Sequence, residues 1–93
     1  MIKHVVCHRY KDKAEAYKIK DMLLSLIGKV ESLRSMEVGI NCVESARSYH
    51  LVLTARFDDL AGLNAYSCNA EHVKVRDYIH TVLEASVSVD YEC

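Results

Sequence analysis

The chain has 93 residues, of which 51% are hydrophobic, and its 12 basic and 13 acidic side chains leave a formal charge of −1. This length allows one domain, spanning residues 1–93, with a thin core that a second copy of the chain would enlarge. No basic stripe is present, which disfavours nucleic acid and acidic membranes as partners.

The N-terminal residues and the cysteines indicate the compartment. Residues 1–10 contain no apolar run long enough for a signal peptide, and no later segment is long enough to span a membrane. The four cysteines, Cys7, Cys42, Cys68 and Cys93, form no C-x-x-C pair. We therefore expect a cytoplasmic protein with four reduced thiols, in preference to two disulfides.

The first two predicted elements are a strand and a helix. Residues 1–10 carry apolar side chains on both parities, which is typical of a strand covered on both faces. Residues 14–30 form an apolar stripe at helical spacing, with Asp12 as a candidate N-terminal cap and Gly28 as a candidate C-terminal cap. The stripe consists of Ile19, Met22, Leu23, Leu26, Ile27 and Val30.

Two further strands are predicted at residues 36–43 and 49–57, joined by a short hairpin connection at residues 44–47. Gly39, inside the first of them, indicates a bulge or a close approach to the backbone. Asp58 and Asp59 are candidate caps of a short helical segment that ends near Tyr66.

The last helix and strand carry the clearest patterns. Asn69 precedes a helical pattern at residues 70–83 and is a candidate N-cap. Residues 85–92 then alternate, with Ala85, Val87, Val89 and Tyr91 on one side and polar residues on the other. The resulting order βαββαβ predicts an α+β ferredoxin-like fold, an antiparallel four-stranded sheet with helices on one face. The other sheet face keeps apolar residues that call for a partner.

His72 is the first candidate functional residue. It falls near the third position of the helix that Asn69 caps, where the positive end of the helix dipole disfavours imidazolium and keeps the ring able to accept a proton. Tyr66 lies six residues earlier, across the cap. The alternative interpretation makes Tyr66 a core residue and His72 a surface or capping histidine.

The remaining candidates are weaker. His4 is either a hydrogen-bonded strand histidine or a site residue, and we interpret His8 as a polar residue at the end of the strand. His4 and His8 lie on the order of 13 Å apart along a strand, and His72 and His80 need outside ligands, so we expect no metal site. Cys68 precedes a helix N-terminus but has no visible acid partner for thiol catalysis. The glycines form no phosphate-binding motif, and we expect no cofactor.

Five segments together resemble the stress-responsive A/B barrel (Dabb) family. They are IKHVVCHRY, SMEVGIN, RSYHLVLTARFDDLAGLNAY, EHVKV and EASVSVDYE, in the family's order over nearly the whole chain. The resemblance implies a dimeric α+β barrel, in which two ferredoxin-like subunits pack sheet to sheet. Fold alone does not choose the chemistry of such barrels.

The chain is also similar to a plant branch of that family, whose polyketide cyclases close a ring by intramolecular aldol condensation. The working residues there are a histidine on the first strand, a tyrosine and a histidine six positions later; His4, Tyr66 and His72 match these places. The family's His-Pro-x-His is here Asn69-Ala70-Glu71-His72. This difference leaves the cap intact, but the resemblance then does not imply that the substrate or the exact loop shape is shared.

Two classes of function follow from the residues and the resemblance. In the first, a homodimer acts as a stress-related or accessory protein, with a hydrophobic cavity between sheet and helices that binds a small molecule or is merely packed. In the alternative, a polyketide cyclase, aldol-type lyase or isomerase uses His72 as general base on a carbonyl compound. A pocket that contains His4, Tyr66 and His72 favours a ligand, whereas filling by Met22, Leu26 and Phe57 indicates a plain core.

Overall fold

The computed structural model describes residues 1–93. Its elements are β1 (Ile2–Tyr10), α1 (Glu15–Leu24), β2 (Ser35–Ile40), β3 (Leu51–Phe57), α2 (Leu60–Cys68), α3 (Ala70–Val82) and β4 (Leu83–Glu92). All strand pairs are antiparallel, in the order β2-β3-β1-β4. The predicted ferredoxin-like arrangement is therefore confirmed.

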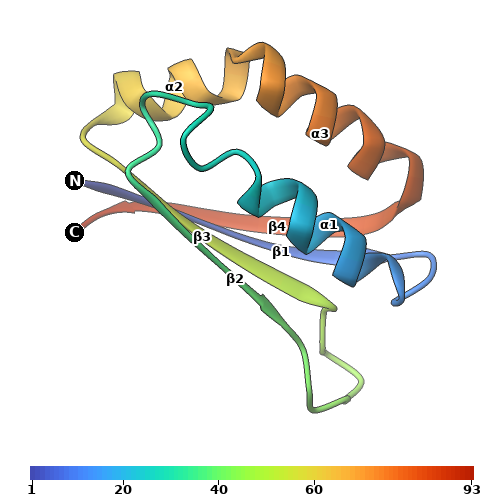
Figure 1. Cartoon of the computed structure of the whole chain (residues 1–93). Helices are drawn as coiled ribbons and strands as arrows, with labels where there is room; N and C mark the ends of the chain where they lie inside the picture. The colour runs from blue at the N-terminus through green and yellow to red at the C-terminus, as the bar shows by residue number, and fades with distance from the viewer.

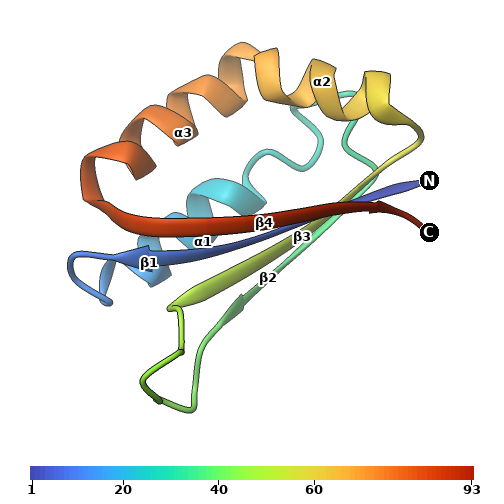
Figure 2. The ribbon, with the colours of Figure 1, turned by 180° about the vertical axis from the view of Figure 1, so that it is seen from behind.

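The molecule has two layers. Figures 1 and 2 show α1, α2 and α3 on one face of the sheet and no element on the opposite face. The two termini lie side by side at one end, where the amide of Cys93 donates to the Met1 carbonyl at 2.9 Å. None of the helices combines the length and the apolar character that a membrane span requires.

The core lies between the helices and the inner sheet face. Strand alternation turns Leu51, Leu53, Ala55 and Phe57 of β3 inward, and all four are buried. The α1 stripe meets them with Ala16, Ile19 and Leu23. Only 18 of 93 residues are buried, so this two-layer molecule has a small core.

The helix expected at residues 14–30 is shorter in the structure. It begins at Glu15 and ends at Leu24, and Asp12 Oδ1 accepts from the Ala14 amide in the turn before it. After Leu24 the chain continues in turns whose amides bond three residues back, as from Leu26 to Leu23. Such turns keep nearly helical spacing, so Leu26 and Val30 still reach the core. The C-cap of α1 is Ser25, so the predicted cap at Gly28 is wrong; Gly28 adopts φ +88° within the turns that follow the helix.

The predicted short hairpin at residues 44–47 is wrong. β2 ends at Ile40 and β3 begins at Leu51, so residues 41–50 form a longer loop. Its side chains bond the loop backbone: Asn41 Nδ2 and Ser48 Oγ both donate to the Val43 carbonyl, each at 3.0 Å. These local bonds compete with strand pairing and end it early.

Gly39 forms no bulge, since it pairs regularly with Val52. A Cβ on Gly39 would lie 3.4 Å from Val52 Cγ1, which is ordinary van der Waals contact. The irregularity of the sheet lies instead at Arg9/Tyr10, where the β1–β4 register shifts.

The predicted caps of the last two helices are present. Asp59 Oδ1 accepts from the Gly62 amide at 2.8 Å at the start of α2, and Asn69 Oδ1 accepts from the Glu71 amide at 2.8 Å at the start of α3. Because a single residue separates the two helices, Tyr66 and His72 are brought close together across Asn69. β4 begins at Leu83, two residues before the predicted position.

The sheet face without helices is apolar at its centre. Register places Val5 of β1 beside Val89, and Cys7 between Val52 and Val87. Val87, Val89 and Tyr91 are exposed by 53%, 64% and 44%. We call this set the open face: Val5, Cys7, Val52, Val87, Val89 and Tyr91.

Candidate functional site

His4, Tyr66 and His72 meet under the helices. His4 comes from β1, Tyr66 from the last turn of α2 and His72 from the first turn of α3. The ring centroids of Tyr66 and His72 are 4.1 Å apart, and those of His4 and Tyr66 are 6.3 Å apart. All three side chains line one cavity of about 140 Å³.

The cavity walls are apolar and belong to both layers. Val6 and Leu53 contribute from the sheet, and Leu23 and Ile79 from the helices. Phe57 packs behind Tyr66 at 5.1 Å between ring centroids, and neither Phe57 nor Leu26 lines the cavity. An open cavity therefore remains beside the three candidate residues, whereas in an ordinary hydrophobic core side chains would fill this space.

His72 has the geometry of a base. Its Nδ1 lies 3.3 Å from the Ser67 carbonyl, which can only accept, so Nδ1 carries the hydrogen and Nε2 keeps the lone pair of the neutral ring. Burial lowers the pKa of His72; Arg76 and His4 lower it further, while the bond to Ser67 acts in the opposite direction. The position of His72 in the sequence predicts that the helix dipole lowers its pKa, whereas in the structure burial is the main cause.

Tyr66 has the properties of a hydrogen-bond donor. Its side chain is 1% exposed, and burial raises its pKa to about 12, so the hydroxyl stays protonated. The hydroxyl has no hydrogen-bond partner in the protein. It is not fully buried either, because Ser32 Oγ is the only fully buried polar side-chain atom that lacks a hydrogen-bond partner. The Tyr66 hydroxyl is therefore open to the cavity that the residue lines.

Asp90 contacts the candidate site, although the sequence pattern does not single it out. It lies opposite His4 in the β1–β4 register, and its Oδ1 accepts a hydrogen bond from His4 Nδ1. A carboxylate can only accept, so the bond orients the imidazole and leaves Nε2 free. The signal in the sequence was the polar side of the final strand, which faces the helices.

His8 also differs from expectation. We interpreted it as a polar residue at the strand end, but it is 7% exposed and lines the same cavity. Burial, with His80 as a smaller cause, lowers its pKa to about 4. The residue therefore lies in the interior, uncharged at neutral pH.

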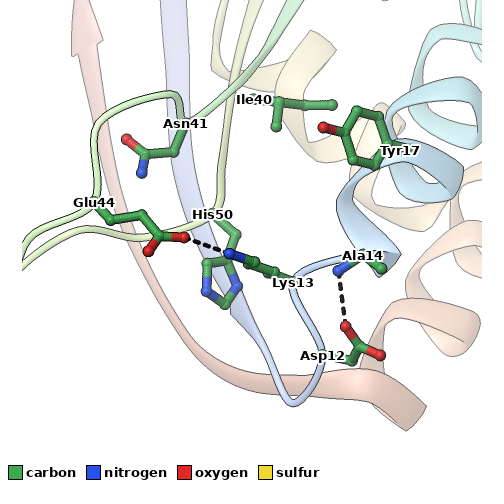
Figure 3. Close-up of a pocket in the computed structure, with 8 residues that line it drawn as sticks. All are labelled: Asp12, Lys13, Ala14, Tyr17, Ile40, Asn41, Glu44 and His50. Carbon is green, nitrogen blue, oxygen red and sulfur yellow. Dashed lines mark hydrogen bonds and ion pairs between the residues drawn. The ribbon is translucent and has the colours of Figure 1, made fainter.

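A larger pocket of about 290 Å³ lies between the start of α1 and the end of β2 (Figure 3). It is an open depression beside the β1–α1 connection, crossed by the Lys13–Glu44 ion pair at 2.6 Å, whose side chains are mostly exposed. His50 in this pocket accepts from the Tyr10 amide at 3.0 Å, which fixes its ring to the backbone. We assign the candidate site to the smaller cavity because buried titratable groups converge there.

The cysteines and the potential metal-ligating side chains form no second candidate site. All four cysteines are free, and Cys68 is exposed at the end of α2. No group of three or more histidine, cysteine or acidic side chains is placed to hold a metal ion.

The comparisons with known proteins agree on family and fold. The profile of the Stress responsive A/B Barrel Domain (Dabb) family matches residues 2–93. A search of curated proteins finds no match.

Three solved structures illustrate the shared fold. A dimeric ferredoxin-like protein of unknown function from Bacteroides fragilis is 26% identical, with 99% of this chain and 95% of that chain covered and a TM-score of 0.88. A Dabb family protein from Mesorhizobium loti is 22% identical, with 99% and 95% covered and a TM-score of 0.76. A hydroxynitrile lyase from Passiflora edulis is 14% identical, with 97% and 90% covered and a TM-score of 0.83.

Proposed function

Since the chain belongs to the stress responsive A/B barrel domain family, we propose that it forms a homodimer in which each subunit binds a small carbonyl compound between sheet and helices. The observation that carries this proposal is the convergence of His4, Tyr66 and His72 on one cavity with apolar walls. A phenol donor beside two imidazoles suits a carbonyl oxygen, and the walls suit the carbon chain.

The homodimer rests on the open face. Its valines and Tyr91 are a large apolar surface for so small a protein, and such surfaces mark protein interfaces. Structural neighbours described as dimeric, such as the protein from Bacteroides fragilis, support the same conclusion. A second copy placed sheet to sheet would cover this face and leave the cavity of each subunit on its helix side.

A second candidate function, proton transfer on the bound carbonyl compound, is favoured by the hydrogen bonding of His72. Neutral His72 would take a proton from the carbon next to the carbonyl through Nε2. Tyr66 would donate a hydrogen bond to the enolate oxygen, and His4, oriented by Asp90, would support it. If the ligand has a second carbonyl, the enolate carbon bonds to that carbonyl carbon, and the new alkoxide takes a proton back from His72. This sequence is an intramolecular aldol reaction.

Heptane-2,6-dione tests both functions. Its carbonyl groups test binding, and its ability to close to a six-membered ring tests the aldol reaction. Proton NMR in D₂O measures loss of its α-proton signals, and a titration followed on the protein measures binding. We expect the catalysed exchange to fall roughly 10²–10⁴-fold in His72→Ala, and less in Tyr66→Phe, which keeps the ring in the wall.

Cys68→Ser is the matched control, since this exposed thiol lies between Tyr66 and His72 in sequence and has no part in the proposal. The Cys68→Ser variant should catalyse exchange of the α-protons of heptane-2,6-dione at the wild-type rate. Binding without exchange would leave the carbonyl-binding function and remove the catalytic one. Absence of binding by both heptane-2,6-dione and simple ketones such as heptan-2-one at millimolar concentration would refute both functions.

A further inference from the structure

The cavity has a second polar end that the proposed chemistry does not use. Besides His4, Tyr66 and His72, its polar lining residues are His8, His80, Ser86 and Arg76. His8 and Ser86 are register partners on β1 and β4, and His80 lies on α3. We call His8, His80 and Ser86 the distal end, because His8 lies four residues along β1 from His4, on the order of 13 Å.

Hydrogen-bond accounting fixes the orientation of His8. Its Nδ1 lies 2.9 Å from the Tyr10 hydroxyl, and this is the hydroxyl's one hydrogen bond. Tyr10 is 1% exposed, so a hydroxyl that accepted from Nδ1–H would leave its own hydrogen unpaired in the interior. The hydroxyl therefore donates to Nδ1, and the neutral ring carries its hydrogen on Nε2.

The Nε2–H group of His8 is the unused donor. It has no hydrogen-bond partner in the protein. It is also not fully buried, because Ser32 Oγ is the only fully buried polar side-chain atom that lacks a hydrogen-bond partner. His8 is 7% exposed and lines the cavity, so this donor opens into the cavity. His80 and Ser86 are exposed, so water competes for their hydrogen bonds; His8 is the shielded group at this end.

We propose that His8, held by Tyr10, donates Nε2–H to a second oxygen of the ligand, so that the ligand is a chain with acceptor oxygens at both ends. This inference rests on the proposed function and narrows its ligand class to dicarbonyl and related bifunctional compounds. A ligand with a purely apolar tail would bury the His8 donor unpaired, which carries a free-energy penalty.

Matched pairs of probes isolate the second oxygen. Heptan-2-one is compared with heptane-2,6-dione, and nonan-2-one with nonane-2,8-dione, by titration followed with protein NMR. An extra carbonyl weakens binding to an apolar pocket, whereas a paired hydrogen bond strengthens it. We expect at least one dione to bind roughly three- to tenfold more tightly than its matched ketone.

Two variants test whether His8 is the donor. His8→Leu with Tyr10→Phe removes both hydrogen-bonding partners together, so no buried orphan remains, and it should abolish the preference for a dione while the ketones still bind. His8→Gln keeps an N–H donor and should retain part of the preference. Histidine ring ¹⁵N shifts should show the Nε2–H form of His8, and a shift of that group on dione binding.

The outcomes separate this inference from the proposed function. Equal affinity for ketone and dione in both wild-type pairs, the Nδ1–H form of His8, or a preference that survives the double variant would each overturn the role of His8 and leave the carbonyl-binding cavity standing. Failure of all four probes to bind would overturn the proposed function, and this inference with it.

Discussion

Truncating a valine of the open face should weaken the homodimer by a calculable amount. Val89 is 64% exposed in the single subunit, so about two thirds of its side chain is available to a partner. Val89→Ala removes two carbon groups, and full burial of each contributes about 0.8 kcal/mol of binding free energy. At this exposure the two groups together contribute about 1 kcal/mol per subunit. A two-fold interface contains the change twice, which gives about 2 kcal/mol and a roughly 30-fold higher dissociation constant.

Sedimentation equilibrium over a concentration series measures that constant. Leu60→Ala is a matched control, because Leu60 is also 64% exposed but begins α2 in the helix layer. Its dimer should dissociate as the wild type does. The reasoning fails if Val89→Ala leaves the constant unchanged, if Leu60→Ala raises it equally, or if the wild type sediments as a 10.6 kDa species at about 100 μM.

Two further predictions concern His8 and Cys7. The pKa of His8 falls from 6.5 to about 4 on folding, so the unfolded chain binds an extra proton between these values, and stability should drop by up to about 3 kcal/mol as pH falls from 6.5 to 4. Urea unfolding should show a flatter pH dependence in His8→Gln, and equal slopes would contradict the burial argument. In a thiol titration of the native protein, the three exposed cysteines should react fast. Cys7 should react slowly, because the partner subunit of the proposed dimer covers the open face on which it lies. Cys7 should become fast in Val89→Ala at low protein concentration, and four equally fast thiols in the wild type would count against a covered open face.

The fold could be predicted from the sequence because its strongest signals are periodic. The alternation of residues 85–92 and the cap at Asn69 are local patterns, and both elements lie within two residues of their predicted positions. The loop at residues 41–50 could not be predicted in this way. It is set by individual bonds from Asn41 and Ser48 to one carbonyl, and such bonds leave no repeat in the sequence.

The candidate site was predictable where it depended on local spacing. Tyr66 and His72 are six residues apart across one cap, and the family pattern added His4. Asp90 and His8 were missed because their environments are tertiary. Asp90 lies 86 residues from His4 in the chain, and His8 lies under the helix layer, whose Leu23 and Ile79 line the same cavity.

The most direct test of the central claim is to locate a bound ketone by methyl NMR. Heptan-2-one should shift the methyl signals of Leu53 and Ile79, which line the cavity beside Tyr66. Val6→Phe, which places a larger side chain in the same cavity, should abolish these shifts while the protein stays folded. Shifts confined to the open face, or to Ile40 in the pocket of Figure 3, would contradict the account.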